Sequence, residues 1–192
     1  MSKERTNYLL DLNEILGPKM SAKLPGFAKR FLRKRLHMDQ INDCIMKAEH
    51  YAGAGFFDEA LNYIGITYKT RGEENLDLSK NYIFACNHPL GGPEALIIGS
   101  VFRRIYGDGF KVPANQILYN MKPLQEFFVP VKVQAGRQNR DIADRFAQMF
   151  ESDCQVLVFP AGLCARTFKG VITEMPWKKM FVTQARRYER DV

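Results

Sequence analysis

The chain reads YIFACNHPLGGPEALII over residues 82–98, and its character changes twice within this stretch. Residues 82–86 are mostly aromatic, β-branched or small and apolar, which is typical of a buried strand. Glycines and prolines then fix a turn, and Pro93 suits the first turn of a helix that the apolar spacing predicts over Glu94–Tyr106. A strand that turns directly into a helix indicates an α/β sheet.

The same alternation extends through the rest of the chain. Short β-branched or aromatic runs predict strands at Ile66–Lys69, Tyr82–Cys86, Phe110–Val112, Phe127–Val133 and Gln155–Phe159. Helical spacing recurs over Arg140–Phe150 and through residues 1–64, where turn residues interrupt it at Gly17-Pro18 and at residues 53–55. We therefore predict an α/β fold, a mixed sheet covered by helices over residues 65–192, preceded by an N-terminal helical section over residues 1–64.

Composition bounds the class of protein. The chain has 192 residues, of which 46% are hydrophobic, enough for one compact domain with a continuous core. Its 28 Lys and Arg residues exceed its 21 Asp and Glu residues, giving a net charge of +7 that favours anionic partners. The basic residues follow no recognised nucleic-acid-binding motif, so we expect anionic lipid or an acidic carrier and no nucleic acid.

The cysteines and the apolar runs bear on the cellular location of the protein. Its four cysteines form no CxxC pair and no cluster with histidine, so we expect no metal site, no disulfide and reduced thiols in the cytosol. No apolar run approaches the roughly 18 to 20 residues that span a bilayer, and no signal core follows Met1. If the protein meets a membrane, we expect it to lie on the surface.

A basic amphipathic segment, Ser21–Leu36, is a candidate for that surface contact. One helical stripe carries apolar residues and the remainder carries cations: Leu24, Phe27, Ala28, Phe31 and Leu32 against Lys23, Lys29, Arg30, Arg33, Lys34 and Arg35. Such a helix can lie in a lipid interface, or its stripe can pack on its own domain while the cations are solvated. Pro25 either starts this helix or lies within it.

His88 is the strongest candidate for a reactive side chain. It follows a predicted strand, at the edge where open α/β sheets place their ligands. The Gly91-Gly92 turn allows Glu94 to return against the imidazole, and a carboxylate would fix its tautomer and stabilise its charged form, as a general base requires. A structural histidine is the simpler alternative. Cys86 also invites a Cys-His nucleophile, although a buried thiol explains it better.

Two motifs give the sequence a family resemblance. Asn87-His88 is followed by the acid Glu94, and Phe159-Pro160-Ala161-Gly162 is followed by Arg166, by Lys169-Gly170 and by Trp177-Lys178-Lys179. From about Ile66 to its last residue the chain resembles the lysophosphatidic acid and glycerol-3-phosphate acyltransferases, most closely their bacterial branch of hemolysin-like proteins and glycerol acyltransferases.

The sequence departs from the family pattern at several positions. Five residues separate His88 from Glu94 where the family has four, and the acid is Glu where the family usually has Asp. Ala161 replaces the usual Glu of the later motif. The chain ends at Val192, where relatives continue into a fourth motif, so the resemblance implies a truncated chain. These departures keep open a second interpretation, a catalytically silent protein of the same fold that binds anionic lipid on a membrane.

The resemblance implies an enzyme that moves a fatty acyl group directly to a hydroxyl of a lysolipid, either lysophosphatidic acid or a lyso-aminolipid of the ornithine or glycine type. The donor would be acyl-CoA or acyl carrier protein, without cofactor or metal, at the inner face of the cell membrane. His88 would be the general base and Glu94 would orient it. Substrate contacts are expected from Asn87, Arg137, Phe159, Pro160, Ala161, Gly162, Arg166 and Lys169. Backbone amides near Gly162 are the expected oxyanion donors.

Overall fold

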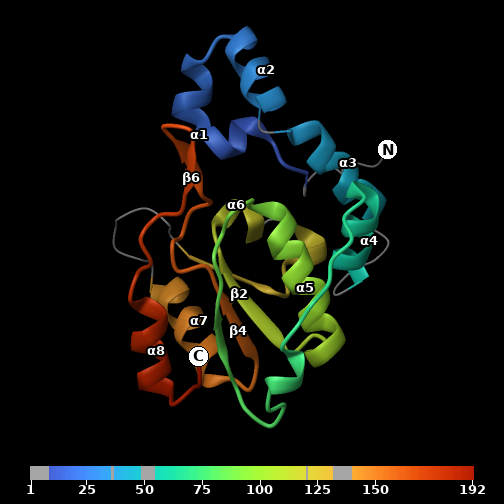
Figure 1. Cartoon of the computed structure of the whole chain (residues 1–192). Coiled ribbons are helices and arrows are strands. Elements are labelled where there is room, and N and C mark those ends of the chain that lie inside the picture. The colour runs from blue at the N-terminus through green and yellow to red at the C-terminus, as the bar shows by residue number, and fades with distance from the viewer. Residues whose placement is uncertain (1–8, 36, 49–54, 120, 132–139) are drawn as a thin grey trace.

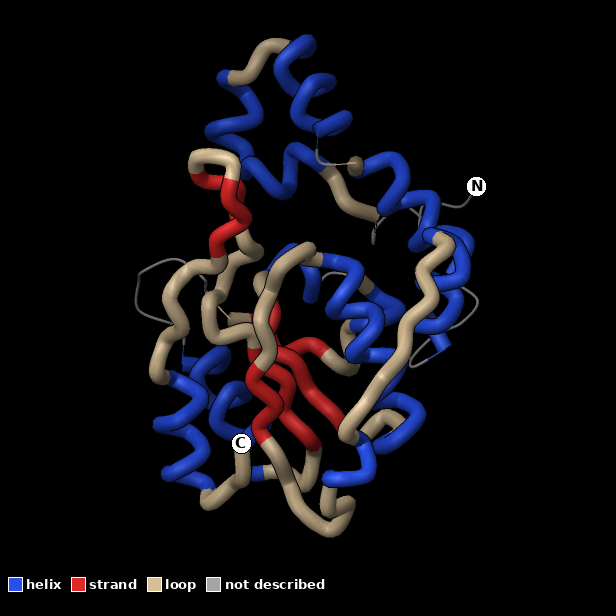
Figure 2. The backbone as a smooth tube through the Cα atoms, in the orientation of Figure 1, coloured by secondary structure: helices blue, strands red, loops and turns tan. Residues whose placement is uncertain are grey.

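The computed structural model describes residues 9–35, 37–48, 55–119, 121–131 and 140–192. A small sheet occupies the centre, helices cover both of its faces, and two N-terminal helices extend beyond one end of it (Figures 1 and 2). In chain order the elements are α1 Leu12–Lys23, α2 Gly26–Arg35, α3 Met38–Ala48, α4 Gly55–Ile64, η1 Glu73–Asn75, β1 Ile83–Ala85, α5 Gly92–Tyr106, β2 Phe110–Ala114, α6 Gln116–Tyr119, η2 Lys122–Leu124, β3 Phe128–Pro130, α7 Arg140–Glu151, β4 Gln155–Val158, β5 Arg166–Phe168, β6 Val171–Thr173 and α8 Met180–Tyr188.

The central sheet has four strands in the order β1-β4-β2-β3, and each neighbouring pair is parallel. Every residue of β4 is buried, as expected for an inner strand of a parallel sheet with helices on both faces. Antiparallel pairing occurs in a separate hairpin, β5–β6. The predicted α/β fold with an N-terminal helical section is therefore confirmed. The sheet is not mixed as expected: within the described residues it is parallel, and the antiparallel pair forms the separate hairpin.

Alternate residues of the strands build two cores. On one face Phe110 and Leu157 pack with Phe57 of α4 and Phe102 of α5. On the other face Val156 of β4 packs with residues of α7 and α8. Period-two alternation thus places two hydrophobic layers against one sheet, which fixes the strand register and aligns the ends of β1 and β4.

The N-terminal helices follow the turn residues of the sequence. Gly17, at φ 73°, interrupts α1 immediately before Pro18, and α2 begins at Gly26, directly after Pro25. Proline therefore starts the basic helix instead of lying within it. Helix α2 buries no residue, and its aromatic side chains Phe27 and Phe31 are exposed.

One predicted strand is absent from the structure. Ile66–Lys69 forms no strand. Its first amide, Ile66 N–H, donates to the Leu61 carbonyl at the end of α4, and the Tyr68 hydroxyl bonds to Ser100 of α5, so the segment crosses α5 instead of joining the sheet.

None of the helices within the described ranges combines the length and the apolar character that crossing a bilayer requires.

The α4–α5 contact generates the first prediction. A Cβ placed on Gly99 would lie 2.4 Å from two ring atoms of Phe57, and that ring packs against the stacked rings of Phe110 and Phe127. Although alanine favours a helix over glycine, the overlap should dominate, and Gly99→Ala should lower the free energy of unfolding by about 1–3 kcal/mol. Urea denaturation measures this loss. Gly26→Ala, whose added Cβ meets no atom within 4 Å, is the control. A Gly99→Ala protein as stable as the parent would contradict the close packing.

Candidate active site

The site forms where two neighbouring parallel strands end. His88 follows β1 and Phe159 directly follows β4, and the register pairs Ala85 with Val158. The two rings stack with centroids 4.3 Å apart and planes inclined by 26°. Because parallel strands present their carboxyl ends at one edge, residues about seventy positions apart become neighbours there.

Glu94 returns across the glycine turn to contact the imidazole. Its Oε1 lies 2.8 Å from His88 Nδ1 and also accepts the N–H groups of Leu90, at 3.0 Å, and Gly91, at 2.7 Å. Gly91 adopts φ 97° and ψ −102°, a conformation that strongly favours glycine. The additional residue between His88 and Glu94 is thus accommodated in this turn, and the two side chains meet in spite of it.

These contacts determine which imidazole nitrogen carries the proton. Glu94 Oε1 already accepts two amide N–H groups, and a carboxylate oxygen only accepts, so His88 donates through Nδ1–H. In the neutral imidazole the lone pair is therefore on Nε2. The side chains are 18% and 13% exposed, so the pair is largely shielded while the imidazole remains partly accessible. Glu94 Oε2 is buried and has no hydrogen-bond partner among the described residues.

Two residues that the sequence did not indicate hold the backbone of His88. Its N–H donates to Glu174 Oε1 at 2.6 Å, and its carbonyl accepts the Ala165 N–H at 2.8 Å. The other carboxylate oxygen, Glu174 Oε2, accepts the indole N–H of Trp177 at 3.2 Å. In the sequence, the neighbouring Trp177-Lys178-Lys179 motif was the available sign that this segment contributes to the site. The motif does not indicate that residue 174 contacts residue 88.

The Phe159–Gly162 segment forms a tight turn beside the imidazole. Gly162 N–H donates to the Phe159 carbonyl at 2.9 Å with Gly162 at φ 72°, and both Pro160 and Ala161 are buried. The amide of Gly162 itself is therefore engaged and is not a free oxyanion donor. Lys178 lies over this turn: its N–H donates to the Pro160 carbonyl at 3.1 Å, and its Nζ lies 3.1 Å from the place of a Cβ on Gly162.

The remaining predicted site residues are more scattered. Asn87 is exposed beside His88, and Arg166 lies in β5 at the base of the hairpin. Lys169 occupies the hairpin turn at φ 49°, with its Nζ 5.6 Å from the centroid of the Phe168 ring, so the structure does not bring it to the imidazole. Arg137 lies outside the described residues.

Cys86 does not form a nucleophilic pair with His88. It continues β1 toward the core, where its N–H donates to the Val158 carbonyl at 3.0 Å and its side chain packs against the hydrophobic cluster. Burial raises the pKa of the Cys86 thiol to about 11, so the unreactive protonated form dominates near neutral pH. The buried-thiol interpretation is the one that this environment supports.

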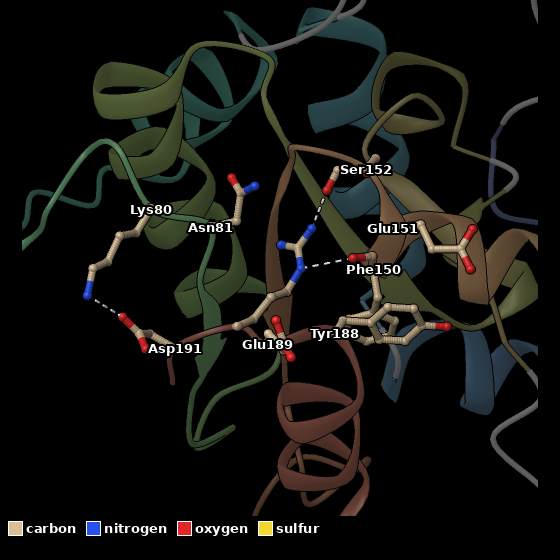
Figure 3. A pocket seen from close by; sticks show the side chains of 9 residues that line it. Lys80, Asn81, Phe150, Glu151, Ser152, Tyr188, Glu189 and Asp191 are labelled. Carbon is tan, nitrogen blue, oxygen red and sulfur yellow. Dashed lines mark hydrogen bonds and ion pairs between the residues drawn. The ribbon is translucent and has the colours of Figure 1, made fainter.

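A pocket of about 470 Å³ lies elsewhere, between the residues preceding β1 and the ends of α7 and α8 (Figure 3). Three of its charged groups, Arg190, Lys80 and Asp191, already have partners within the protein. Arg190 donates to the carbonyls of Phe150, Ser152 and Cys154, and Lys80 bonds to Asp191 at 2.7 Å. These contacts fasten the end of α8 to the sheet. Within the described ranges, no group of three or more His, Cys, Asp or Glu side chains could hold a metal.

Comparison with known proteins adds an independent observation. A family model described as "Acyltransferase" matches residues 12–192. A lyso-glycine lipid O-acyltransferase of Bacteroides thetaiotaomicron is 34% identical over 188 residues, which cover 96% of this chain and 69% of that protein. One from Phocaeicola vulgatus is 30% identical over 188 residues, which cover 96% and 67%. No solved structure matches significantly.

The burial of Cys86 generates a prediction for its reactivity. With a pKa of about 11, its thiolate fraction should rise about tenfold for each pH unit between pH 7 and pH 10. Its alkylation rate with iodoacetamide should rise in the same way, as measured by mass spectrometry of the peptide that contains it. Alkylation that levels off near pH 8.5, the range of an ordinary cysteine, would contradict the buried assignment.

Proposed function

The chain belongs to the acyltransferase family and is an O-acyltransferase, and on that premise we propose that it transfers a fatty acyl group from a thioester donor to a hydroxyl of a lyso-aminolipid. The two relatives are both lyso-glycine lipid O-acyltransferases, which favours a glycine-type lysolipid over lysophosphatidic acid as the acceptor. Acyl-CoA or acyl carrier protein would supply the thioester, and both are acidic partners suited to a chain of net charge +7.

The observation that carries this proposal is the 2.8 Å contact between His88 Nδ1 and Glu94 Oε1, which leaves Nε2 as the nitrogen that can meet a substrate. In the proposed reaction Nε2 takes the proton of the acceptor hydroxyl as its oxygen attacks the thioester carbonyl. The tetrahedral intermediate then collapses, the carbon–sulfur bond breaks, and the imidazolium returns its proton to the departing thiolate. Glu94 stabilises the imidazolium between these two steps, so no acyl-enzyme is required.

Positive side chains beside the imidazole are suited to the anionic parts of the substrates. Lys178 lies over the turn at Gly162, and Arg166 opens β5 directly after the segment whose Ala165 bonds to His88. We assign these two cations to a head group of the acceptor or to phosphates of the donor, where a planar guanidinium suits bidentate contact. Lys169, at the turn of the hairpin, is less suited to this role.

The proposed acceptor is a lipid, so the enzyme should work at the surface of the cell membrane. Helix α2 supports this location, because five cations follow Phe27 within ten residues while its two aromatic side chains are exposed. The intact contact between His88 and Glu94 favours catalysis over the alternative of a silent lipid-binding protein of the same fold.

Removing the imidazole tests the reaction directly. We expect His88→Ala in the full-length protein to lower turnover by about 10²- to 10⁴-fold, the usual contribution of a general base, with an unchanged circular dichroism spectrum. Transfer of a radiolabelled acyl group from acyl-CoA or acyl carrier protein to lyso-glycine lipid is the assay. The control is His37→Asn, since His37 is exposed and its φ of 51° is tolerated by Asn. Equal turnover by His88→Ala and the parent would refute the mechanism.

Glu174 should act as a positioning residue. Without Glu174 the backbone N–H of His88 loses its acceptor, so the backbone that positions the imidazole is less restrained. Glu174→Ala should therefore lower kcat by about ten- to hundredfold with little change in KM. Glu174→Gln keeps a carbonyl oxygen for that N–H and should retain kcat within about threefold. The exposed Glu126→Ala is the matched control. A Glu174→Gln protein as impaired as Glu174→Ala would show that the charge, and not the hydrogen bond to His88, is required.

A further inference from the structure

The β5–β6 hairpin projects from the domain. All three residues of each strand are exposed, and within the described part of the chain the two strands pair only with each other. Figures 1 and 2 show the hairpin extending away from the sheet toward the end of the molecule that carries α1 and α2. A two-stranded hairpin is marginally stable in water without further support, so its side chains indicate what surrounds it.

The hairpin is apolar near its tip on both faces. Phe168, Val171 and Ile172 are 67%, 64% and 71% exposed. The register places Phe168 opposite Val171 on one face, whereas Ile172 lies opposite Thr167 on the other. A hairpin that rests on a flat protein surface needs one apolar face. Apolar groups on both faces fit a tip that is surrounded by an apolar medium.

The charged residues near the hairpin indicate the kind of apolar medium that surrounds its tip. Residues 165–173 contain Arg166 and Lys169 and no acid. Lys169 Nζ lies 5.6 Å from the centroid of the Phe168 ring, within the range of a cation–π contact, so a cation lies directly beside the exposed aromatic side chain. Helix α2 projects from the same end (Figure 1) and combines cations with exposed aromatic side chains in the same way.

We propose that the tip of the β5–β6 hairpin inserts into the interfacial layer of an anionic lipid bilayer, as a second docking element beside α2. Phe168, Val171 and Ile172 enter the boundary between head groups and acyl chains, and Lys169 contacts lipid phosphates. This docking site extends the proposed function, since it assumes that the acceptor is taken from a membrane.

The base of the hairpin holds the proposed general base. Ala165, directly before β5, donates to the carbonyl of His88, and Glu174, directly after β6, accepts its N–H. Both strands therefore lead from the backbone of His88 to the tip. Three strand residues span about 10 Å, so docking would hold the imidazole about that far from the lipid interface. A lysolipid could then present its hydroxyl while its acyl chain remains in the bilayer.

Vesicle binding tests the docking element on the full-length protein. The double variant Phe168→Ser/Ile172→Ser should bind vesicles of phosphatidylglycerol and phosphatidylcholine at least about tenfold more weakly than the parent. Leu78→Ser/Val182→Ser removes two exposed apolar side chains from the loop before β1 and from α8, and should bind as the parent does. Equal binding by the hairpin variant and the parent would overturn the proposal.

Acyl transfer separates this proposal from the proposed function. The hairpin variant should retain parental turnover on a short-chain lysolipid dissolved as monomers and lose at least about tenfold on the same head group embedded in vesicles. Equal losses on both acceptors would mean that the hairpin serves the reaction and not the membrane. If the parent acylates neither acceptor, the proposed function fails, whereas the vesicle-binding comparison still decides the role of the hairpin.

Depth measurement identifies what surrounds the tip. The Phe168→Trp variant should show additional tryptophan fluorescence, and lipids brominated near the head-group end of their acyl chains should quench it. The additional fluorescence of the Leu78→Trp variant should not be quenched. Subtraction of the parent spectrum removes the contribution of Trp177. Emission from Phe168→Trp that is blue-shifted before vesicles are added, and that brominated lipids do not quench, would show that a protein segment or a second copy covers the tip. That result would overturn the proposal.

Discussion

The 2.8 Å contact between His88 Nδ1 and Glu94 Oε1 is the interaction on which the proposed chemistry of this protein depends. It exists because Gly91 adopts a conformation that most residues avoid, which lets the first turn of α5 place a carboxylate behind the imidazole. The same oxygen accepts two amide N–H groups of the turn, so the carboxylate is fixed before any substrate arrives. The fold thus prepares the imidazole for the proton acceptance at Nε2 that we propose.

The parallel sheet supplies the second constraint. Because β1 and β4 are neighbours in register, Phe159 stacks on the imidazole, and the turn that follows carries the chain into the hairpin. The hairpin in turn holds both backbone groups of His88 through Ala165 and Glu174. The proposed general base is therefore supported by Glu94 of α5 on one side and by a distant segment on the other, which limits its freedom without burying it.

Polarity is distributed along the molecule in a way that suits an enzyme acting on lipids. The edge of the sheet that carries His88 continues into the hairpin, and the exposed apolar side chains of the hairpin and of α2 project from one end. The pocket between the ends of α7 and α8 lies away from this edge, and its guanidinium is saturated by backbone carbonyls. The proposed catalytic edge at His88 and the contacts that hold the end of the chain at Arg190 thus lie in different parts of the molecule.

The sequence by itself determined the features that depend on near neighbours. The strand, the glycine turn and the helix around His88 lie within seventeen residues, so apolar periodicity and glycine chemistry were sufficient to predict them and the return of Glu94. The α/β class followed from the same periodicities. Only the tertiary structure decided that Ile66–Lys69 crosses α5 and that Glu174 and Lys178 join the site. Strand propensity does not specify which segments find a partner at the sheet, and hydrogen bonds between residues 86 positions apart leave no periodic trace in the chain.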